Sequence, residues 1–552
     1  MNTSCPVRKD VETNSGTKKT EKLKNKTGKT GDSLASGVMI LTVSNLLVKT
    51  LGMFFKIPMN YFVGDTGMGY YNAAYTIYSF FYMLSTAGLP AAVSVMAAAA
   101  RADGQQRQCR RILHTALGLF CLIGMAGSAV FGFFSEELAG LIGAPPASLC
   151  ILAIAPTLFF VCIASALRGY FQGCSLMVPT AVSQLLEALC KVGVGILGAM
   201  YGIRSNAPPQ VTAAYAIVGL TLGSAVSMLY LLVRDMITRT SGYQSQPQLL
   251  QPVKTVLKNL TTIALPVTLS SAVMSLTGVM DTLLIQRLLQ QNGFTEETAA
   301  AMYGNYTSLA VPLFNLPPVL VYPVAYAIVP VLAGSRHEKH GPVILSALRI
   351  AVLLGLPCSM GLAVLSEPIL KLLYRESSAL TAAPLLTLLA PSSLLVCILA
   401  VTNSVLQSIG KPGLPVYSML AGTVVKGTAE IVLIPYIGMA AAPISTFTCY
   451  LIVTTMNLYF LIRHTSLRSD GKADWMKPFA ASLICAGSAW LVYSLCCTVF
   501  SERLSVLMAI PTAAGVYLFL IRKLRILKAE DILLLPGKRK LRKWFAITEN
   551  GN

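Results

Sequence analysis

The chain contains fourteen long apolar runs, and these constrain its fold more than any other feature of the sequence. A helix needs roughly 20 apolar residues to cross a hydrocarbon core about 30 Å thick. In lipid, only helices or closed barrels satisfy their own backbone hydrogen bonds. The runs lie at 34–57, 68–98, 112–134, 149–171, 178–202, 211–233, 260–288, 303–333, 344–365, 379–408, 413–436, 440–463, 477–499 and 504–522. We therefore predict an all-α integral membrane protein of about 14 transmembrane helices.

Composition supports the same class. Of the 552 residues, 54% are hydrophobic and only 12% are charged, which leaves too little polar surface for a soluble protein. The formal net charge of +20 would suggest nucleic-acid binding in a soluble protein, but here the basic residues gather in short loops and in the two tails. We predict no nucleic-acid partner.

The distribution of Lys and Arg between alternate loops predicts the orientation. With the N-terminus in the cytoplasm, 33 of the 43 Lys and Arg residues are assigned to the cytoplasmic side, and five are assigned to the runs. In this count most basic residues near the end of a run are grouped with the adjoining loop. The five in the opposite loops are Arg204, Arg287, Lys371, Arg375 and Arg503. The positive-inside rule therefore predicts a multi-pass cell-membrane protein with both termini in the cytoplasm.

An internal repeat predicts two related lobes. Gln172 precedes Lys191 by 19 residues, and Gln407 precedes Lys426 by the same 19 residues. Transporters are commonly built from such duplications, with the substrate site between the copies. The predicted division is a disordered basic tail at 1–33, an N-lobe at 34–240, a C-lobe at 241–470, two further spans at 471–528 and a second basic cytoplasmic tail at 529–552.

Ionisable side chains within the spans are the candidate functional residues, because burying a charge in a bilayer costs roughly 2.5–3.5 kcal/mol on insertion scales. Lys49 and Lys56 lie seven residues apart and share one face of the first span. Either both attract an anion, or Lys56 extends to the interface along its own aliphatic stem. A lysine can bind phosphate as a point charge, and an arginine can bind it with two parallel N–H donors.

Carboxylates accompany the deeper lysines. Glu187 precedes Lys191 by four residues and Glu430 follows Lys426 by four, so each pair lies on one helix face. Such pairs are either packing features that neutralise themselves or parts of a polar network. Asp281 either faces a cavity or partners one of the lysines. Arg168, at the end of the fourth span, either holds a phosphate or anchors its helix, and Arg349 is expected to extend to the interface.

Other chemistries find little support in the sequence. The 13 cysteines are scattered, with neither a Cys-x-x-Cys pair nor His spacing for zinc, so we predict no metal site. The chain lacks the Walker pattern of ATP-hydrolysing proteins, and no cofactor is expected. It also lacks a large polar loop of the kind that a membrane glycosyltransferase or polymerase needs to hold a donor.

Several segments together resemble the multidrug/oligosaccharidyl-lipid/polysaccharide exporter superfamily, and most of all its stage V sporulation protein B and polysaccharide-transporter branch. They are Val48-Lys-Thr-Leu-Gly52, Gly67-Met-Gly-Tyr-Tyr71, Ser85-Thr-Ala-Gly-Leu-Pro90, Arg168-Gly-Tyr-Phe-Gln-Gly173, Pro179-Thr-Ala-Val-Ser-Gln184 and Tyr306-Thr-Ser-Leu-Ala-Val-Pro312. The resemblance implies alternating access between two lobes and a lipid-linked cell-wall precursor as cargo, as in MurJ-type lipid II flippases. It also implies that Lys49 occupies a position that is basic in those flippases. No arginine stands in Tyr78–Tyr82 or Pro312–Asn315, where they carry one.

From these observations we expect a flippase rather than an enzyme. It would move an undecaprenyl-pyrophosphate-linked sugar, such as a peptidoglycan precursor, outward as a monomer among membrane lipids. Lys49, Lys56, Arg168, Lys191 and Lys426 are the expected substrate-binding residues. Glu187, Asp281, Glu430, Gln172 and Gln407 form the expected polar network. Coupling to the membrane potential, Na⁺ or H⁺ stays open, and the alternatives are a drug/cation antiporter of the same superfamily and a membrane glycosyltransferase.

Overall fold

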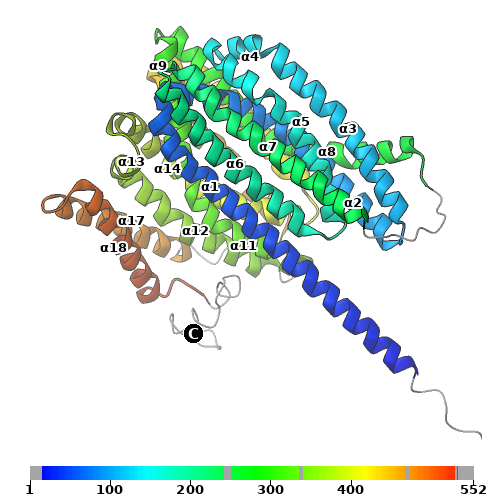
Figure 1. The fold of residues 1–552 in the computed structure, drawn as a ribbon. Helices are drawn as coiled ribbons and strands as arrows, with labels where there is room; N and C mark the ends of the chain where they lie inside the picture. Colours follow the sequence, from blue (N-terminus) through cyan, green and yellow to red (C-terminus); the bar gives the residue numbers. More distant parts are fainter. Residues whose placement is uncertain (1–14, 241–249, 335–339, 466–472, 529–530, 532–552) are drawn as a thin grey trace, which may run out of the picture.

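The computed structural model describes residues 15–240, 250–334, 340–465 and 473–528 together with Asp531. Regular secondary structure within these residues is entirely helical, as the apolar runs predict. Long helices lie side by side, and α17 and α18 form the outermost pair on one side of the molecule (Figure 1).

The helices of the first half and of the second half follow one another through short connections. The first half contains α1 (Ser15–Thr86), α2 (Gly88–Ala102), α3 (Gln106–Phe133), α4 (Ser135–Ile142), α5 (Ser148–Gly173), α6 (Met177–Arg204) and α7 (Pro209–Thr240). The second half contains α8 (Val253–Gln291), α9 (Glu296–Asn305), α10 (Val311–Phe314), α11 (Leu316–Gly334), α12 (His340–Val364), α13 (Ser366–Leu373), α14 (Glu376–Ser408), α15 (Gly413–Ile437), α16 (Ala441–His464), α17 (Ala473–Cys497) and α18 (Glu502–Lys523).

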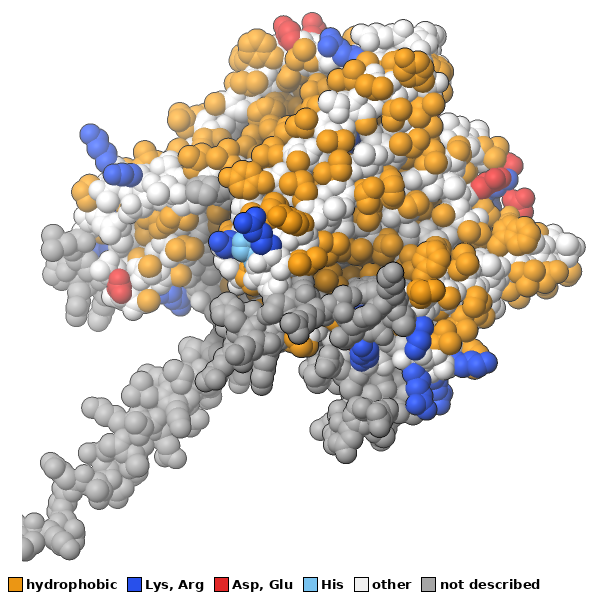
Figure 2. Space-filling model, turned by 180° about the vertical axis from the view of Figure 1, so that it is seen from behind, with side chains coloured by type: hydrophobic (Ala, Val, Ile, Leu, Met, Phe, Trp, Pro, Cys, Tyr) orange, Lys and Arg blue, Asp and Glu red, His pale blue; other side chains and the backbone are white. Residues whose placement is uncertain are grey.

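Eleven helices of the described part are long and apolar enough to cross a membrane, or twelve when one bent pair counts as a span. Two of these candidates extend over 53 and 52 residues, each more than twice the length that one crossing needs. If both cross twice, the number reaches the predicted fourteen, which stays a prediction. Hydrophobic side chains dominate the face seen in Figure 2, and charged side chains gather in a few clusters on it. Such a surface fits a lipid environment.

Helix α1 combines the first predicted span with most of the second. Gly64 interrupts it with φ 74° and ψ 172°, a conformation that a side chain disfavours. The chain therefore turns between the two spans without the short loop that the sequence suggests. At its start α1 differs from the predicted disordered tail, because residues 15–33 are helical. Lys and Glu in this stretch are good helix formers. Residues 1–14 lie outside the described part.

The eighth predicted span is broken. Helix α9 leads into a π-helical turn at Tyr306–Ala310, then α10, and α11 follows at an angle of 43°. Pro312 has no N–H group and cannot donate to the carbonyls of the preceding turn. Two of these carbonyls accept from distant parts of the chain instead: Ser308 O from the Tyr374 hydroxyl at 3.4 Å and Thr307 O from Lys56 Nζ at 2.8 Å.

Helix α8 joins the two halves of the molecule. Its first part packs on α2 and α3, where Val256, Leu260 and Ala264 enter a buried cluster of the first half. Its second part packs on α15, where Met280 lies against Gly427. Apart from α8, the larger contacts between α1–α7 and the second half are made by α9 and the π-helical turn.

A group of ion pairs fastens the last two helices. Lys371 of α13 bonds Glu367 at 2.9 Å and lies 3.9 Å from Glu502, at the start of α18. The hydrogen bond to Glu367 raises the pKa of Lys371. Near the other end of α12, Arg349 forms a buried ion pair with Asp531 at 3.2 Å. The expectation that Arg349 extends to the interface is therefore wrong, because this carboxylate neutralises it inside the protein.

Candidate functional site

In the first half, the buried Arg168 and the partly buried Glu187 form an ion pair. Nη2 of Arg168 lies 2.7 Å from Glu187 Oε2 and donates to Ser227 Oγ at 2.8 Å, while Nε donates to Ser183 Oγ at 3.0 Å. These contacts join α5, α6 and α7. Of the two roles expected for Arg168, this geometry favours anchoring, because its donors are directed at protein acceptors rather than at open space.

Replacing Arg168 with Ala should strongly destabilise the protein. Removal of one partner leaves Glu187 buried without its cation, which typically costs about 3–5 kcal/mol. Arg168→Lys keeps the charge but loses the planar fork that reaches three acceptors, so we expect an intermediate loss. Thermal unfolding of the purified protein in detergent measures both. A wild-type melting temperature for the Ala variant would contradict the structural role.

Lys191 does not pair with Glu187, although the two lie four residues apart on α6. Its ammonium group lies 4.5 Å from the centroid of the Tyr75 ring and 5.8 Å from that of Phe55, both on α1. A cation over an aromatic face is attracted by the ring quadrupole. The expected pairing of Glu187 with Lys191 is therefore wrong, because Arg168 offers Glu187 a better-aligned partner from the neighbouring helix.

Lys56 lies next to Phe55, in the same region between helices. It donates to the carbonyl of Thr307 in the π-helical turn, so α1 contacts the second half at this point. The alternative in which Lys56 extends to the interface is not what the structure shows. Lys191 belongs to the same region, because its ammonium group lies 5.8 Å from the ring centroid of Phe55, the residue before Lys56. Lys49 lies on α1, but its side chain falls outside the described part of the structure.

In the second half, Lys426 of α15 has two carboxylate neighbours. Its Nζ lies 2.5 Å from Asp281 Oδ1 on α8 and 4.0 Å from Glu430 Oε1 on its own helix. Glu430 accepts from Ser445 Oγ at 3.1 Å and is completely buried. Asp281 is thus a lysine partner, one of the two roles that the sequence left open. The closer contact crosses between helices, so this network ties α8 to α15.

The two glutamines of the repeat lie away from these networks. Gln172 is half-buried near the end of α5, and Gln407 is exposed near the end of α14. Among the described residues, neither side chain bonds Glu187 or Glu430. The equal Gln-to-Lys spacing therefore does not bring glutamine and lysine together.

Sequence analysis missed the polar cluster around Asp65. This carboxylate accepts from Ser378 Oγ at 2.7 Å, Asn60 Nδ2 at 3.2 Å and Asn305 Nδ2 at 3.2 Å. It lies directly after the turn at Gly64 and joins α1 to α9 and α14. We call Asp65, Asn60, Asn305 and Ser378 the Asp65 cluster. The only available signal was a single acidic residue in a very short connection between two apolar runs.

Close helix packing surrounds the Asp65 cluster. Gly69 of α1 meets the backbone of Ala300, and Gly304 of α9 meets the backbone of Asp65, so a side chain at either glycine would collide with main-chain atoms. Nearby, the Tyr70 hydroxyl donates to Glu296 at 3.1 Å and Arg375 donates to the carbonyl of Tyr61 at 2.7 Å. At this end, therefore, the two halves are closed against each other.

A bundle of apolar helices with buried charges and two halves that meet through broken helices defines a membrane transporter. The model for the family described as "Polysaccharide biosynthesis protein" matches residues 34–336, and that for the MatE family matches residues 266–429. The chain belongs to the polysaccharide biosynthesis protein family, and it is a transporter of the multidrug/oligosaccharidyl-lipid/polysaccharide exporter superfamily rather than an enzyme.

Two curated relatives come from Bacillus subtilis strain 168. Stage V sporulation protein B is 26% identical over 514 residues, covering 91% of this chain and 97% of that protein. Lipid II flippase MurJ is 24% identical over 452 residues, covering 78% of this chain and 83% of that protein. Both alignments extend over most of each chain, so the similarity includes both predicted lobes.

Solved structures show the same fold. A lipid II flippase MurJ in an inward closed conformation matches with a TM-score of 0.69 at 15% identity, covering 88% of this chain and 99% of the other. An inward-facing multidrug transporter of the MATE family matches with a TM-score of 0.59 at 15% identity, covering 77% and 98%. The fold is that of the superfamily that the sequence motifs resemble.

Proposed function

We propose that the protein is a flippase that moves an undecaprenyl-pyrophosphate-linked sugar from the inner to the outer leaflet by alternating access. The observation that supports this most directly is the state of Lys56 and Lys191. Within the described residues neither forms an ion pair: one donates to a carbonyl and the other lies on an aromatic ring. Two neighbouring cations without carboxylate partners suit a phosphorylated headgroup. The printed name of one relative, lipid II flippase MurJ, gives a cargo of this class.

The proposed orientation places the Asp65 cluster at the outer end, because α1 starts on the cytoplasmic side in this arrangement. The structure then corresponds to a state closed toward the outside. On the inner side α11 packs on α12 and α14 of its own half, while α8 keeps its contacts with α2. Substrate would enter from the inner leaflet, with its prenyl tail in lipid, and the Asp65 cluster would have to separate for release.

The membrane potential favours this direction of movement. One elementary charge moved through 100 mV is worth about 2.3 kcal/mol, so an anion with roughly two charges gains several kcal/mol when it leaves an inside-negative cell. Lys56 and Lys191 are attached to helices that rearrange, and any outward movement of their positive charges with the substrate would reduce that gain. Coupling to Na⁺ or H⁺ is compatible with the same cycle.

Replacing Lys56 and Lys191 together with Gln should abolish flipping. A hydrogen bond to a charged group contributes about 1.5–3 kcal/mol, so we expect each single variant to slow transport about tenfold or more. The assay expresses each variant in a strain depleted of its own lipid II flippase and asks on which leaflet the lipid-linked precursor accumulates. Lys477→Gln, which removes an exposed lysine of α17, is the matched control. Normal flipping by the double variant would contradict the proposal.

The competing function is a drug/cation antiporter, and the MatE match together with the partly buried Asp281 and the buried Glu430 favours it as the second candidate. Expression in a sensitive host followed by a panel of toxic organic cations separates the two. Only an antiporter should confer resistance, and Asp281→Asn should then remove it. A flippase leaves sensitivity unchanged.

A further inference from the structure

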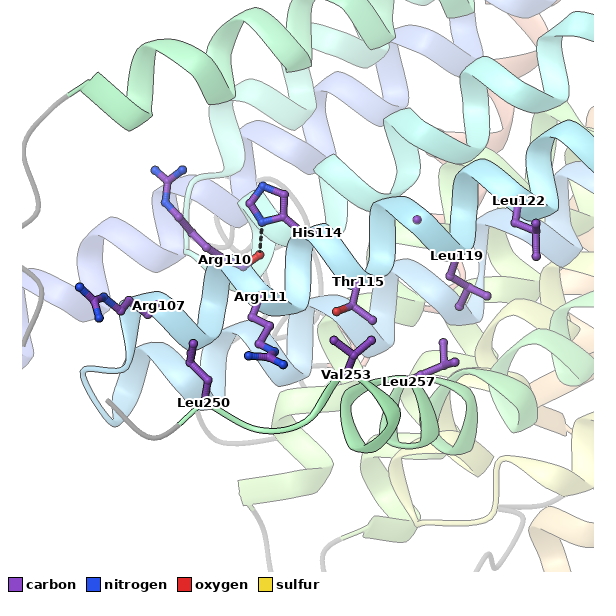
Figure 3. A pocket seen from close by; sticks show the side chains of 11 residues that line it. Arg107, Arg110, Arg111, His114, Thr115, Leu119, Leu122, Leu250, Val253 and Leu257 are labelled. Carbon is purple, nitrogen blue, oxygen red and sulfur yellow. Dashed lines mark hydrogen bonds between the residues drawn. The ribbon is translucent and has the colours of Figure 1, made fainter. Parts of the chain in front are cut away.

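A groove opens between the first turns of α3 and the start of α8. It has a volume of about 810 Å³, and Figure 3 shows it from close by. One side is formed by α3 and the other by the stretch from Leu250 to Leu257. Neither half of the molecule forms this groove alone, because α3 belongs to the first half and α8 begins the second.

The end of the groove near the start of α3 is strongly basic. Arg107, Arg110, Arg111 and His114 line it, and no acidic residue is among its lining residues. In Figure 3 the Arg111 side chain extends from α3 toward the segment between Leu250 and Val253. Nε of Arg111 is buried and has no hydrogen-bond acceptor among the described residues. A buried donor atom of a guanidinium group suits an anionic ligand, because buried polar groups are normally satisfied.

The other end of the groove, further along α3, is apolar. Leu119 and Leu122 line it from α3, about 12 and 16 Å further along the helix than Arg111 at 1.5 Å per residue. Leu257 faces them from α8. Leu122 is 64% exposed, so its side chain is free to contact a lipid chain. The arginines at one end of the groove match a phosphate headgroup. The leucines further along α3 match the acyl chains attached to it.

The floor of the groove is fixed by packing. Gln108 Oε1 accepts from the backbone N–H of Gln251 at 3.1 Å, which fastens the lead-in of α8 to α3. Beneath it, Ile112 and Ala116 pack with Val256 and Leu260 in one buried cluster. The site is therefore already formed and does not depend on a ligand to bring the two helices together.

We propose that this groove binds an anionic diacyl phospholipid of the inner leaflet. The phosphate lies among Arg107, Arg110 and Arg111, and the chains lie along Leu119, Leu122 and Leu257. Basic pockets between helices on the cytoplasmic side of membrane proteins are typical sites for anionic headgroups. A free phosphate would leave the leucines uncovered, whereas a phospholipid satisfies both parts. The bound lipid bridges α3 and α8 and so stabilises the contact between the halves. The site is separate from Lys56 and Lys191.

The test measures lipid retention by the full-length protein. Native mass spectrometry follows binding of phosphatidylglycerol and phosphatidylcholine to the detergent-purified chain. We expect the Arg107→Gln/Arg110→Gln/Arg111→Gln variant to lose phosphatidylglycerol binding about tenfold or more, because each charged contact contributes about 1.5–3 kcal/mol. Lys411→Gln/Arg463→Gln/Lys477→Gln, which removes three exposed basic residues elsewhere, should bind as the wild type does.

The wild-type protein provides a readout that needs no variant. It should retain phosphatidylglycerol in preference to phosphatidylcholine, and inorganic phosphate should not displace the lipid. Equal retention of the two lipids, or unchanged binding by the triple Arg variant, would overturn the proposal. Displacement of phosphatidylglycerol by an added polyprenyl phosphate would also overturn it, because the groove would then belong to the transported substrate. Loss of flipping in the Lys56 and Lys191 variants leaves this result unaffected, so the two proposals fail separately.

Discussion

Replacing Lys426 with Met should destabilise the protein and abolish transport. The variant leaves the Asp281 and Glu430 carboxylates close together without the cation that lies 2.5 Å from one and 4.0 Å from the other. Breaking a buried ion pair typically costs about 3–5 kcal/mol, because the remaining charge stays in a medium that solvates it poorly. Thermal unfolding in detergent gives the stability effect, and the leaflet assay gives the effect on transport.

The double variant Lys426→Met/Asp281→Asn separates stability from function. It removes both charges of the closer pair and should recover part of the melting temperature, since no uncompensated Asp281 remains. If the network takes part in transport, the recovered protein stays inactive. Recovery of both properties would show that the pair serves packing alone, and a wild-type melting temperature for Lys426→Met would show that the pair does not form.

Cross-linking the Asp65 cluster should stop transport completely. Asp65 Oδ1 and Ser378 Oγ lie 2.7 Å apart, so cysteines at both positions are close enough to join the two halves through a disulfide or a short bifunctional reagent. Alternating access requires this end to open, and a covalent bridge holds it closed. The readout is flipping before and after oxidation, and again after a reductant is added.

The controls are the single variants Asp65→Cys and Ser378→Cys. Oxidation should change their flipping no more than it changes flipping by the wild type, which contains the same native cysteines. Failure of the double variant to cross-link would contradict the contact itself. Full cross-linking with undiminished flipping would contradict the proposed opening at this end, whatever the substrate is.

The partners of the buried charges show where reasoning from sequence ended. Equal spacing suggested that Glu187 pairs with Lys191, and Glu430 with Lys426, on the same helix. In the structure the shorter contacts are made across helices, from Glu187 to Arg168 and from Lys426 to Asp281. Residues four apart on one helix are neighbours, but a side chain from an adjacent helix can approach more directly. That approach depends on helix packing, which spacing along one chain does not reveal.

The broken eighth span is the opposite case, because the local sequence explains the break in the helix. The run 303–333 contains several prolines, and the structure has a π-helical turn and a bend there. The reason is covalent, since proline lacks the N–H that the preceding carbonyl needs. Which residues donate to the vacant carbonyls could not be predicted, because Lys56 and Tyr374 are brought there from distant parts of the chain.

Sequence alone determined that the chain is a bundle of membrane-spanning helices of this superfamily. Backbone groups in lipid must form hydrogen bonds within their own segment, which a helix achieves. An apolar run that is long enough to cross the membrane therefore predicts a helix. Only the tertiary structure decided how the charges are partnered, that Asp65 joins the halves at one end, and that α3 and the start of α8 line one groove. These contacts join residues far apart in the chain, and their geometry follows from the packing of helices against one another.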